Sequence, residues 1–467
     1  MTGENLNTRT REEEPFLRAR GMVYERYREI AKEMIMAGVK AADPTQAVMD
    51  SVKLSGKTLT VRGDTFNLED YDKILMFGIG KAAAPMAGAL EQVVECDGGL
   101  VIIKKGDEIG EAEVNSVPVY EAYHPEPRAE NVKYSSMILD QIKALDPNSR
   151  TLVFFLITGG GSALFSVPPE GISIDELFRM NELLMHCGAN IYDINTIRKH
   201  VSQVKGGRFG QLCSEHGATV ISLILSDVVG DDLSVIASGP TYKDQTTFED
   251  AIRLAKQYGI WDEMPESIRQ HLEKGLSHPE MEPPRELPPN VHNYLIGNSM
   301  GALLAAEKVA KEAGFNTMIL TSQNTGEAKY IAKCIMGIAK EVQDTQRPIA
   351  PPAALIIGGE MTVTFRWEER DGFGPNREFV LASAIEIANR ENIVVAGADS
   401  DGEDGQGKSG AIADCRTVHR TKLDAKWHLD KHEAEAYFDD LGDSLEFESH
   451  TNVNDIDVVL IGPKGDA

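Results

Sequence analysis

Cysteine is scarce in this sequence of 467 residues, which has five cysteines and no C-x-x-C pair. A disulfide framework or a zinc site would need cysteines, or cysteines together with histidines, in close and regular spacing. The sequence has no such cluster, which argues against a disulfide-stapled extracellular module and against a zinc enzyme. We therefore expect a protein of the reducing cytoplasm.

Long hydrophobic runs and an excess of positive charge are also missing. Apolar runs such as TLVFFLI are far below the roughly 18–20 residues that a membrane helix needs, and the start, MTGENLNTRTREEEPF, is too polar for a signal peptide. Lys and Arg number 47 against 73 Asp and Glu, a net charge of −26. Such a surface repels nucleic acids and anionic membranes, so an anionic small molecule would need a locally positive pocket.

What the sequence has instead is an alternation of helical and strand-like segments. Residues 12–50 show helical spacing of apolar residues, and nine short apolar runs follow. The runs lie at 73–79, 98–104, 151–158, 219–226, 292–297, 317–322, 354–359, 392–397 and 457–462. Most are continuous, which is typical of parallel strands covered by helices on both faces. We predict parallel α/β sheets in two or three domains, with a boundary or hinge in the Pro- and Glu-rich segment 277–292.

The first glycine-rich strand end, FGIGKAAAP, has the outline of a phosphate-binding turn. Gly78 and Gly80 would let the backbone approach an anion, and Lys81 would add positive charge. It is not a Walker A loop, because the first glycine of that motif would fall at Leu75 and its hydroxyl residue at Ala82. From the residues alone, a strand–helix turn that needs glycine for packing is an equally good interpretation.

A second glycine-rich turn, LITGGGSALF, follows the third apolar run. Gly159, Gly160 and Gly161 would form a nest of N–H groups around an anion, with the Ser162 hydroxyl beside them. Three consecutive glycines lose much backbone entropy on folding, which packing alone rarely requires. A purely structural turn is the alternative. The G-x-S-x-G elbow of serine hydrolases is absent, since position 164 is Leu.

The segment NTIRKHVSQVKGGR gathers cations in an otherwise acidic chain. At helical spacing Asn195 and Arg198 share one face, and Lys205 continues it. Gly206 and Gly207 would then end the helix. A solvated basic face is the plain interpretation, but a polar stripe that leads into Lys-Gly-Gly favours binding of a phosphate or nucleotide.

Carboxylates and hydroxyls follow further strands. Asp227 comes directly after the run at 219–226, and the turn SGPT presents Ser238 and Thr241. Asp401 lies among glycines and other acids in ADSDGEDGQG, whose spacing does not match an EF-hand. Carboxylates at strand ends suit magnesium binding or general-base catalysis. The alternatives are a capping role for Asp227 and a flexible acidic turn around Asp401.

These motifs occur in a familiar order. GIGKAAAPMA, HPEP, TGGGSAL, NTIRKHVSQVKGGR, SDVVGDDLSVIASGPT, IGNSMGAL, GGEMTV, DGEDG and TNVNDI follow one another as in class II glycerate kinases, which the sequence resembles over residues 20–462. The carboxy-terminal part of that family is called the MOFRL domain. The resemblance implies an α/β protein of two domains: a larger Rossmann-like parallel-sheet domain over 1–285 and a smaller MOFRL-type domain over 290–467. It also implies an active site in the cleft between them.

The resemblance further implies ATP-dependent phosphorylation of D-glycerate, usually at the 2-hydroxyl, with Mg²⁺. Lys81 stands where the family has its phosphate-contacting lysine. Other polar positions of the family's cleft correspond to Ser162, Asn195, Arg198, Lys205 and Asp227. One departure is that the family's cleft arginine position is Pro375 here, while Arg377 replaces a glutamine. Arg377 would supply the missing charge only if its loop has a different conformation.

Phosphoryl transfer needs N–H groups around phosphates, a cation on the transferred group, magnesium held by carboxylate, and an oriented hydroxyl. We assign Lys81 or Arg377 to the charge of the transferred group and Arg198 to the substrate carboxylate. Asp227, with Asp401 or Asp404 in reserve, would hold Mg²⁺ or orient the glycerate hydroxyl. One glycine-rich turn would bind ATP phosphates and the other the substrate carboxylate.

Two other functions are compatible with these residues. A hydroxypyruvate-reducing oxidoreductase would bind a dinucleotide at G-x-G-x-x-G, whose third glycine is Ala83 here, with Glu95 or Asp97 near the distance of the ribose-binding acid. A sugar-phosphate-binding module would bind phosphate esters without turnover. The sequence is also compatible with a homo-oligomer.

Overall fold

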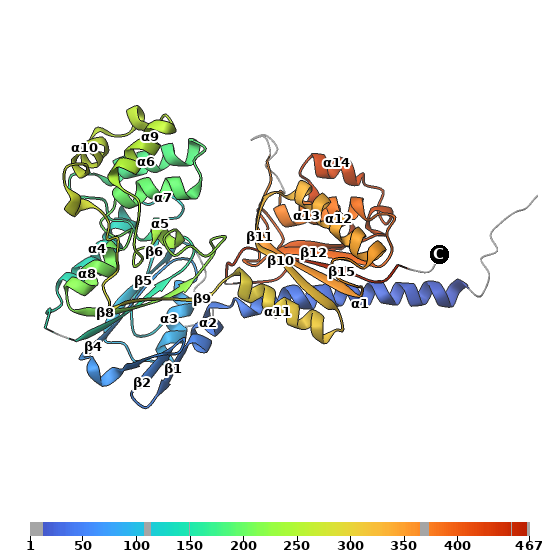
Figure 1. The fold of residues 1–467 in the computed structure, drawn as a ribbon, viewed down its shortest axis with the longest axis horizontal. Coiled ribbons are helices and arrows are strands. Elements are labelled where there is room, and N and C mark those ends of the chain that lie inside the picture. The colour runs from blue at the N-terminus through green and yellow to red at the C-terminus, as the bar shows by residue number, and fades with distance from the viewer. Residues whose placement is uncertain (1–12, 107–113, 149, 365–372, 450, 465–467) are drawn as a thin grey trace, which may run out of the picture. The chain divides into compact units, whose positions relative to one another are not determined.

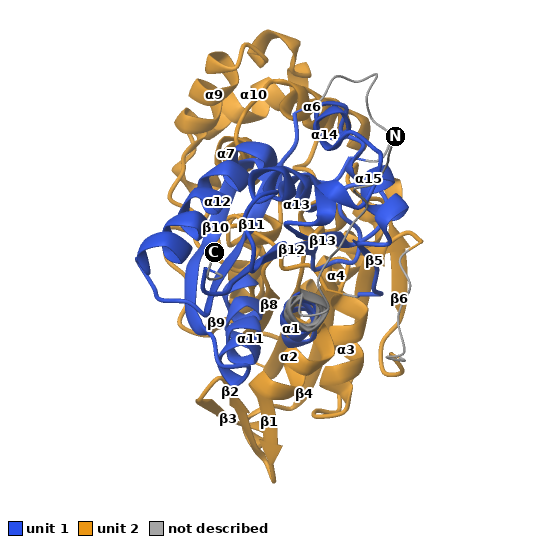
Figure 2. Ribbon diagram, turned by 90° about the vertical axis from the view of Figure 1, so that its right-hand side faces the viewer, with its two compact units in different colours: residues 1–41, 299–449, 454–467 blue, residues 42–298, 450–453 orange. Residues whose placement is uncertain are grey.

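The computed structural model describes residues 13–106, 114–148, 150–364, 373–449 and 451–464 (Figure 1). The chain forms two compact units, drawn in different colours in Figure 2. One comprises residues 42–298 and 450–453, and the other comprises residues 1–41, 299–449 and 454–467. The first helix therefore belongs to the unit that is otherwise built from the carboxy-terminal part of the chain.

The 42–298 unit is organised around a six-stranded parallel sheet. In spatial order its strands are β6 (Val119–Ala122), β5 (Gly98–Lys104), β4 (Lys73–Ile79), β7 (Thr151–Ile157), β8 (Ala218–Leu225) and β9 (Val291–Gly297). Every neighbouring pair is parallel. This is the strand order of Rossmann folds, in which the direction of winding reverses between β4 and β7. Ligands of such sheets bind beyond the carboxyl ends of the strands at that reversal.

Helices cover both faces of this sheet, which explains why its strands are apolar along their whole length. β7 is buried at every position. One face is packed by α2 (Pro44–Ser51) and α3 (Ala83–Glu91), and the other by α4 (Ala129–Lys143) and α8 (Arg208–Glu215). A separate apolar core joins α6 (Ile174–His186), α7 (Ile191–His200), α9 (Phe248–Gln257) and α10 (Glu266–Gly275).

Smaller elements complete this unit. A three-stranded antiparallel sheet is formed by β1 (Val52–Ser55), β2 (Thr58–Val61) and β3 (Asp64–Asn67). The short helix α5 (Gly161–Leu164) follows β7. Single 3₁₀ turns are η1 (Leu68–Asp70), η2 (Ile236–Ser238), η3 (Trp261–Glu263) and η4 (Pro279–Met281).

The other unit contains a mixed six-stranded sheet. Its spatial order is β10 (Asn316–Glu327), β11 (Ala353–Thr362), β15 (Asp455–Ile461), β12 (Ile393–Asp399), β13 (Gly410–Asp414) and β14 (Ser444–Leu445). β10 and β11 are parallel, whereas β15 is antiparallel to both β11 and β12. One group of helices in contact is α1 (Glu13–Ala41) with α11 (Ser299–Glu312). The second group is α12 (Ala328–Thr345), α13 (Pro375–Glu386), α14 (Ala425–Asp430) and α15 (Ala434–Leu441), with the turn η6 (Thr417–His419) beside α13.

The nine strands predicted from apolar runs all form, and the helical prediction for 12–50 is confirmed by α1 and α2 over the described residues. The all-parallel prediction holds for the first sheet and fails for the second. β15 inserts between β11 and β12 in the antiparallel direction. An apolar run signals burial on both faces, and such burial does not fix strand direction.

The domain boundaries differ from those expected at 285 and 290. The division falls at 298/299, and residues 1–41 join the other unit. The segment 277–292, expected as a hinge, lies inside the 42–298 unit because its backbone and side chains accept hydrogen bonds from that unit. The Asp244 N–H donates to Pro284 O at 3.0 Å, and the Phe248 N–H donates to a Glu282 carboxylate oxygen at 3.1 Å.

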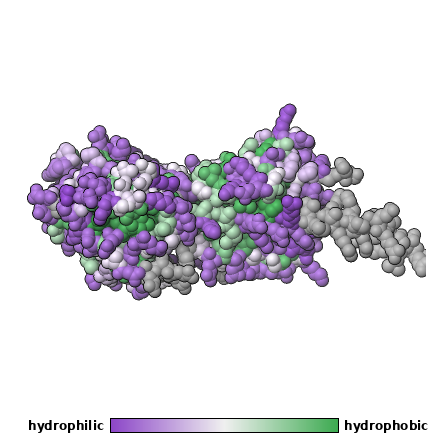
Figure 3. Space-filling view, turned by 90° about the horizontal axis from the view of Figure 1, so that it is seen from below, coloured by the Kyte–Doolittle hydropathy of each residue, from purple (hydrophilic) through white to green (hydrophobic). Residues whose placement is uncertain are grey.

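The surface fits the composition. Hydrophilic residues cover most of the face drawn in Figure 3, in keeping with the net charge of −26. Across the described ranges, no helix has the length and apolar character needed to cross a bilayer. The five cysteines are free thiols.

Candidate active site

Three predicted residues meet where β4, β7 and β8 end, at the reversal of strand order. The Lys81 N–H, just beyond β4, donates to Gly159 O at 2.9 Å, just beyond β7. A Cβ atom on residue 159 would collide with Oδ2 of Asp227, which follows β8. Glycine at 159 is therefore what lets the Asp227 carboxylate lie against this turn.

The acid and the cation of this cluster have different environments. Burial raises the pKa of Asp227, and the Lys81 charge acts in the opposite direction. Lys81 itself is partly exposed, and within the described residues its ammonium makes no ion pair and no side-chain hydrogen bond. A lysine that has no carboxylate at ion-pair distance and lies near a half-buried acid is an arrangement that can receive an anionic group.

The turn around Gly78 and Gly80 does not form the predicted cradle of free N–H groups. Gly78 lies within β4, and the Gly80 N–H donates to Ile102 O at 3.2 Å. Gly80 has φ +124°, and a Cβ there would collide with Thr158 Oγ1, which accepts from the Ala82 N–H at 3.1 Å. Gly80 allows the turn to pack closely on Thr158 after β7, while Gly78 faces Val101 of β5 and Ala83 of α3. The residue of this turn that can serve the site is Lys81.

A histidine that was not predicted as a site residue lies over the second turn. His124 follows β6 and packs on Gly160, where a Cβ would lie 3.2 Å from His124 Cδ2 and 3.6 Å from Lys81 Cγ. Burial and the charges of Lys81 and Lys104 lower the pKa of His124 to about 4. The available signal was a histidine directly after a strand end, within the HPEP motif.

A chain of hydroxyl contacts connects α5 with α7. Ser162 Oγ and Ser238 Oγ lie 2.7 Å apart, and Ser238 Oγ donates to Asn195 Oδ1 at 2.8 Å. Ser238 has φ +61°, so the sharp turn predicted for SGPT is present and directs this hydroxyl to the site. Thr241, expected beside it, is instead buried between Ser222 and Asn293.

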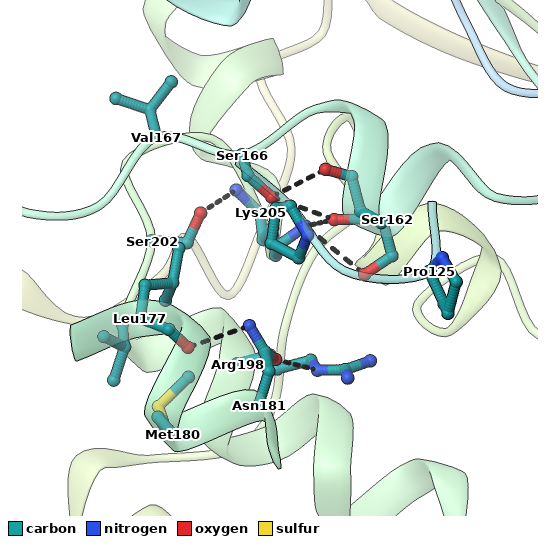
Figure 4. Close-up of a pocket in the computed structure, with 13 residues that line it drawn as sticks. Pro125, Ser162, Ser166, Val167, Leu177, Met180, Asn181, Arg198, Ser202 and Lys205 are labelled. Carbon is teal, nitrogen blue, oxygen red and sulfur yellow. Dashed lines mark hydrogen bonds between the residues drawn. The ribbon is translucent and has the colours of Figure 1, made fainter. Parts of the chain in front are cut away.

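Lys205 is buried and holds the backbone after the glycine turn. Its ammonium donates to Ser162 O, to Phe165 O at 3.2 Å and to Ser162 Oγ at 3.3 Å (Figure 4). Burial, with a smaller contribution from the Arg198 charge, lowers the pKa of Lys205 to about 7. With all its donors engaged, Lys205 positions Ser162, and a direct phosphate contact, as predicted from sequence, does not fit this geometry.

Arg198 lies beside Lys205 at a small cavity of about 30 Å³. Its Nε donates to Asn181 Oδ1 at 2.8 Å, and no carboxylate among the described residues pairs with it (Figure 4). Burial lowers the pKa of Arg198 to about 10, so the guanidinium is charged at neutral pH. The cavity is also lined by Ser162, Ser166, Ser202, Lys205 and Pro125.

The predicted helix through Gly206 and Gly207 is shorter than expected. α7 ends at His200, because the Ser202 hydroxyl accepts from the N–H groups of Val204 and Lys205 and so competes with helical bonding. The Gly206 N–H donates to Ser238 O at 3.0 Å and the Gly207 N–H to Gly239 O at 2.7 Å. These two glycines fasten the SGPT turn, and their N–H groups are not available to a nucleotide.

Arg377, predicted to act on the transferred group, is surrounded by carboxylates and backbone carbonyls of its own unit. It is fully buried in the unit containing 299–449, where its Nε lies 3.1 Å from Asp404 Oδ2 and its Nη1 lies 2.6 Å from Glu435 Oε2. Backbone carbonyls of Phe373 and Asp404 accept its remaining donors. An arginine neutralised by two acids does not fit a role in stabilising phosphoryl charge.

Asp401, the reserve metal ligand, takes part in a local turn. Its N–H donates to Asp399 Oδ1 at 3.0 Å, and its Oδ1 accepts from the Glu403 N–H at 2.9 Å. Across the described ranges, no three His, Cys, Asp or Glu side chains are grouped to hold a metal. The pair His428 and His432 has H-x-x-x-H spacing, but α14 ends between them, and their Nδ1 atoms bond to Asp424 O and Glu378 Oε1 respectively.

Comparison with known proteins agrees with this fold. Residues 30–273 match the family described as domain of unknown function DUF4147, and residues 353–455 match the MOFRL family. The chain is 39% identical over 442 residues to a glycerate 2-kinase of Pyrococcus horikoshii, covering 94% of this chain and 98% of that protein. A D-glycerate 2-kinase of Thermotoga maritima is 36% identical over 402 residues, covering 85% and 88%.

A solved structure shares the whole architecture. The crystal structure of a glycerate kinase from Thermotoga maritima matches with a TM-score of 0.81 at 34% identity, over 94% of this chain and all of that one. The chain therefore belongs to the glycerate 2-kinase family, whose Rossmann-like and MOFRL parts it contains. The resemblance read from the order of the motifs is confirmed.

Proposed function

We propose that this protein is an ATP-dependent kinase that phosphorylates D-glycerate on the 2-hydroxyl to give 2-phosphoglycerate. The observation that carries the proposal is the meeting of Lys81, Gly159 and Asp227 at the reversal point of the parallel sheet. The position is where Rossmann-like sheets bind ligands. The named activity of relatives at 36–39% identity supports the same reaction.

In this proposal Lys81 acts on the phosphoryl group and Asp227 acts on the glycerate hydroxyl. Lys81 lies close enough to the turn to neutralise charge that develops on the transferred phosphoryl group. Asp227 would accept a hydrogen bond from the glycerate hydroxyl and take its proton as the bond to phosphorus forms. Burial raises the pKa of this acid, which makes its carboxylate a better base than an exposed one.

The substrate carboxylate would bind at Arg198. Its guanidinium borders the small cavity and has no acidic partner among the described residues, so it can offer two N–H groups to a carboxylate. Ser162, held by Lys205 and Ser238, lies on the same cavity and would position the substrate between Arg198 and Lys81.

Mg²⁺ is the expected metal because it binds oxygen and is usually held by one or two carboxylates together with substrate phosphates. Asp227, a half-buried carboxylate at the turn, is the candidate ligand, and holding the ion would be an alternative to its role as the base. The ion would neutralise charge on the phosphates of the nucleotide. The five free cysteines are consistent with a cytoplasmic location, which we include in the proposal.

The oxidoreductase alternative has weaker support. Asp97, one of its candidate ribose-binding acids, accepts from the Ile74 N–H at 2.8 Å, at the start of β4. Glu95 also precedes β5. Both acids thus belong to the amino edge of the sheet, whereas a dinucleotide would bind at the carboxyl edge.

The test is release of ADP from ATP in the presence of D-glycerate and Mg²⁺, with the product offered to enolase. Immediate consumption by enolase indicates 2-phosphoglycerate, and a requirement for a mutase indicates 3-phosphoglycerate. A parallel assay contains NADH and hydroxypyruvate. Turnover in that assay, with none on glycerate and ATP, would overturn the kinase proposal.

A further inference from the structure

Three other histidines of this chain, buried or half-buried, bond to main-chain carbonyl oxygens. His200 Nδ1 bonds to Thr196 O at 2.7 Å, His271 Nε2 to His200 O at 3.0 Å and His428 Nδ1 to Asp424 O at 2.8 Å. Within the described residues, neither ring nitrogen of His124 has a hydrogen-bond partner. A half-buried imidazole that has no protein partner keeps its donor and its acceptor nitrogen available to a ligand.

The position of the ring indicates which ligand. The space above Gly160, where a Cβ would stand, lies 3.4 Å from His124 Nε2 and 3.6 Å from Lys81 Cγ. Gly160 has φ +81°, a conformation that glycine adopts easily, and any side chain there would enter this space. His124 and Lys81 therefore border the same opening, and whatever Lys81 binds comes within reach of the imidazole.

Burial is the main cause that keeps the imidazole neutral. It lowers the pKa of His124, and the charges of Lys81 and Lys104 act in the same direction. A neutral imidazole carries one N–H donor and one acceptor nitrogen. Its donor can bind a phosphoryl oxygen, while the ring adds no further positive charge beside Lys81.

We propose that His124 is a further substrate-contacting residue, whose neutral imidazole donates a hydrogen bond to an oxygen of the same γ-phosphoryl group that Lys81 contacts. The inference rests on the proposed kinase function, because that function supplies the phosphoryl group. A purely structural role would instead make His124 a packing residue on Gly160.

The two roles are separated by a pair of variants. His124→Leu keeps most of the volume and removes the donor, whereas His124→Gln restores an amide N–H near the position of Nε2. We expect kcat for glycerate phosphorylation to fall by about 10–100-fold in the Leu variant, as for loss of one donor to a charged oxygen. The Gln variant should recover most of it. His278→Leu, at an exposed histidine of the same unit, is the matched control and should leave kcat unchanged.

Binding without turnover gives an independent measurement. By titration calorimetry with Mg²⁺, His124→Leu should weaken the ATP analogue AMP-PNP by about tenfold and leave ADP within about twofold, because only AMP-PNP carries a group at the γ position. Unchanged AMP-PNP affinity would overturn the inference, and so would equal weakening of both nucleotides. It would also be overturned if the Gln variant lost as much kcat as the Leu variant while both kept the wild-type melting temperature.

The calorimetry also separates this inference from the proposed function. If the wild-type protein does not phosphorylate glycerate but its AMP-PNP binding depends on His124 as described, the substrate assignment fails and the role of His124 holds. If glycerate is phosphorylated and the affinity for AMP-PNP is the same in wild type and His124→Leu, the kinase proposal holds and the role of His124 fails.

Discussion

Cations near the two sheets of this protein differ in whether they have carboxylate partners. At the carboxyl edge of the parallel sheet, Lys81 and Arg198 have no acidic partner among the described residues, and Lys205 is bonded to carbonyl and hydroxyl oxygens. In the mixed sheet, Arg377 is held by Asp404 and Glu435.

The mixed sheet also has an excess of buried acids. Burial and the neighbouring charges of Asp404 and Asp399 raise the pKa of Asp457 well above its ordinary value, and both its carboxylate oxygens lack a hydrogen-bond partner within the described residues. The proposed function rests on this difference. Arg377 has carboxylate partners within its own unit, whereas we expect Lys81 and Arg198 to receive theirs from a ligand.

The largest expected effect is on turnover. Lys81→Ala should lower kcat by about a thousandfold or more, since it removes the charge opposite the developing phosphoryl charge. The melting temperature should change little because the ammonium has no protein partner to lose. ADP release and a thermal melt measure both. Activity within a few-fold of wild type would show that Lys81 does not contact phosphate.

Arg377→Met should affect folding instead. It leaves Asp404 and Glu435 without their cation, and breaking a buried ion pair from one side destabilises by about 3–5 kcal/mol. Denaturant titration followed by fluorescence or circular dichroism would measure the loss. If Arg377→Met folded as well as wild type and lost only kcat, the arginine would belong with Lys81 and the contrast between the two sheets would fail.

Arg198→Met should act mainly on substrate binding. Loss of the fork that holds the carboxylate should raise KM for glycerate by about 10–100-fold, corresponding to a charged hydrogen bond, with a smaller change in kcat. Initial rates at varied glycerate and saturating ATP give both constants. An unchanged KM would place the substrate carboxylate elsewhere.

Asp457→Asn should produce the smallest effect, visible in the pH dependence of stability. The folded-state pKa of Asp457 is raised, so the acid is protonated in the folded protein at low pH without penalty. As the pH rises above the unfolded-state pKa of about 3.9 toward the folded value, the unfolded state releases its proton first and the wild-type protein loses stability. The asparagine variant should lose less between pH 5 and pH 8 in thermal melts. If the melting temperatures of wild type and Asp457→Asn changed with pH by the same amount, the raised pKa of Asp457 would be contradicted.

The strands were predictable and their arrangement was less so. Continuous apolar runs such as TLVFFLI identify strands because burial on both faces leaves no polar positions. The antiparallel insertion of β15 beside β11 depends on contacts between residues about a hundred positions apart, which no local pattern records. The same limit applies to the domain boundary, because a Pro-rich segment looks like a linker until its backbone partners are known.

Candidate site residues could be named from the sequence where residue chemistry was enough. Lys81, Asp227 and Arg198 were identified as a cation, an acid and a guanidinium following strands or on a polar helix face. The roles of Gly80, Gly206 and Lys205 depended on whether their N–H groups are already engaged, and the sequence carries no record of that. His124 has no neighbouring motif residue whose spacing the sequence could reveal, and what distinguishes it is its position over Gly160 beside Lys81.

The placement of α1 has a consequence for synthesis of the chain. Met34 and Ile35 of this helix are buried in a unit whose next segment begins at Ser299. At roughly 5–20 residues per second, the ribosome needs tens of seconds to make the intervening residues 42–298. During that time the inserted unit can fold while the first helix still lacks its partners. Ribosome-bound or truncated chains ending before α11 should therefore present the uncovered apolar face of this helix to chaperones, although their Rossmann-like sheet is complete.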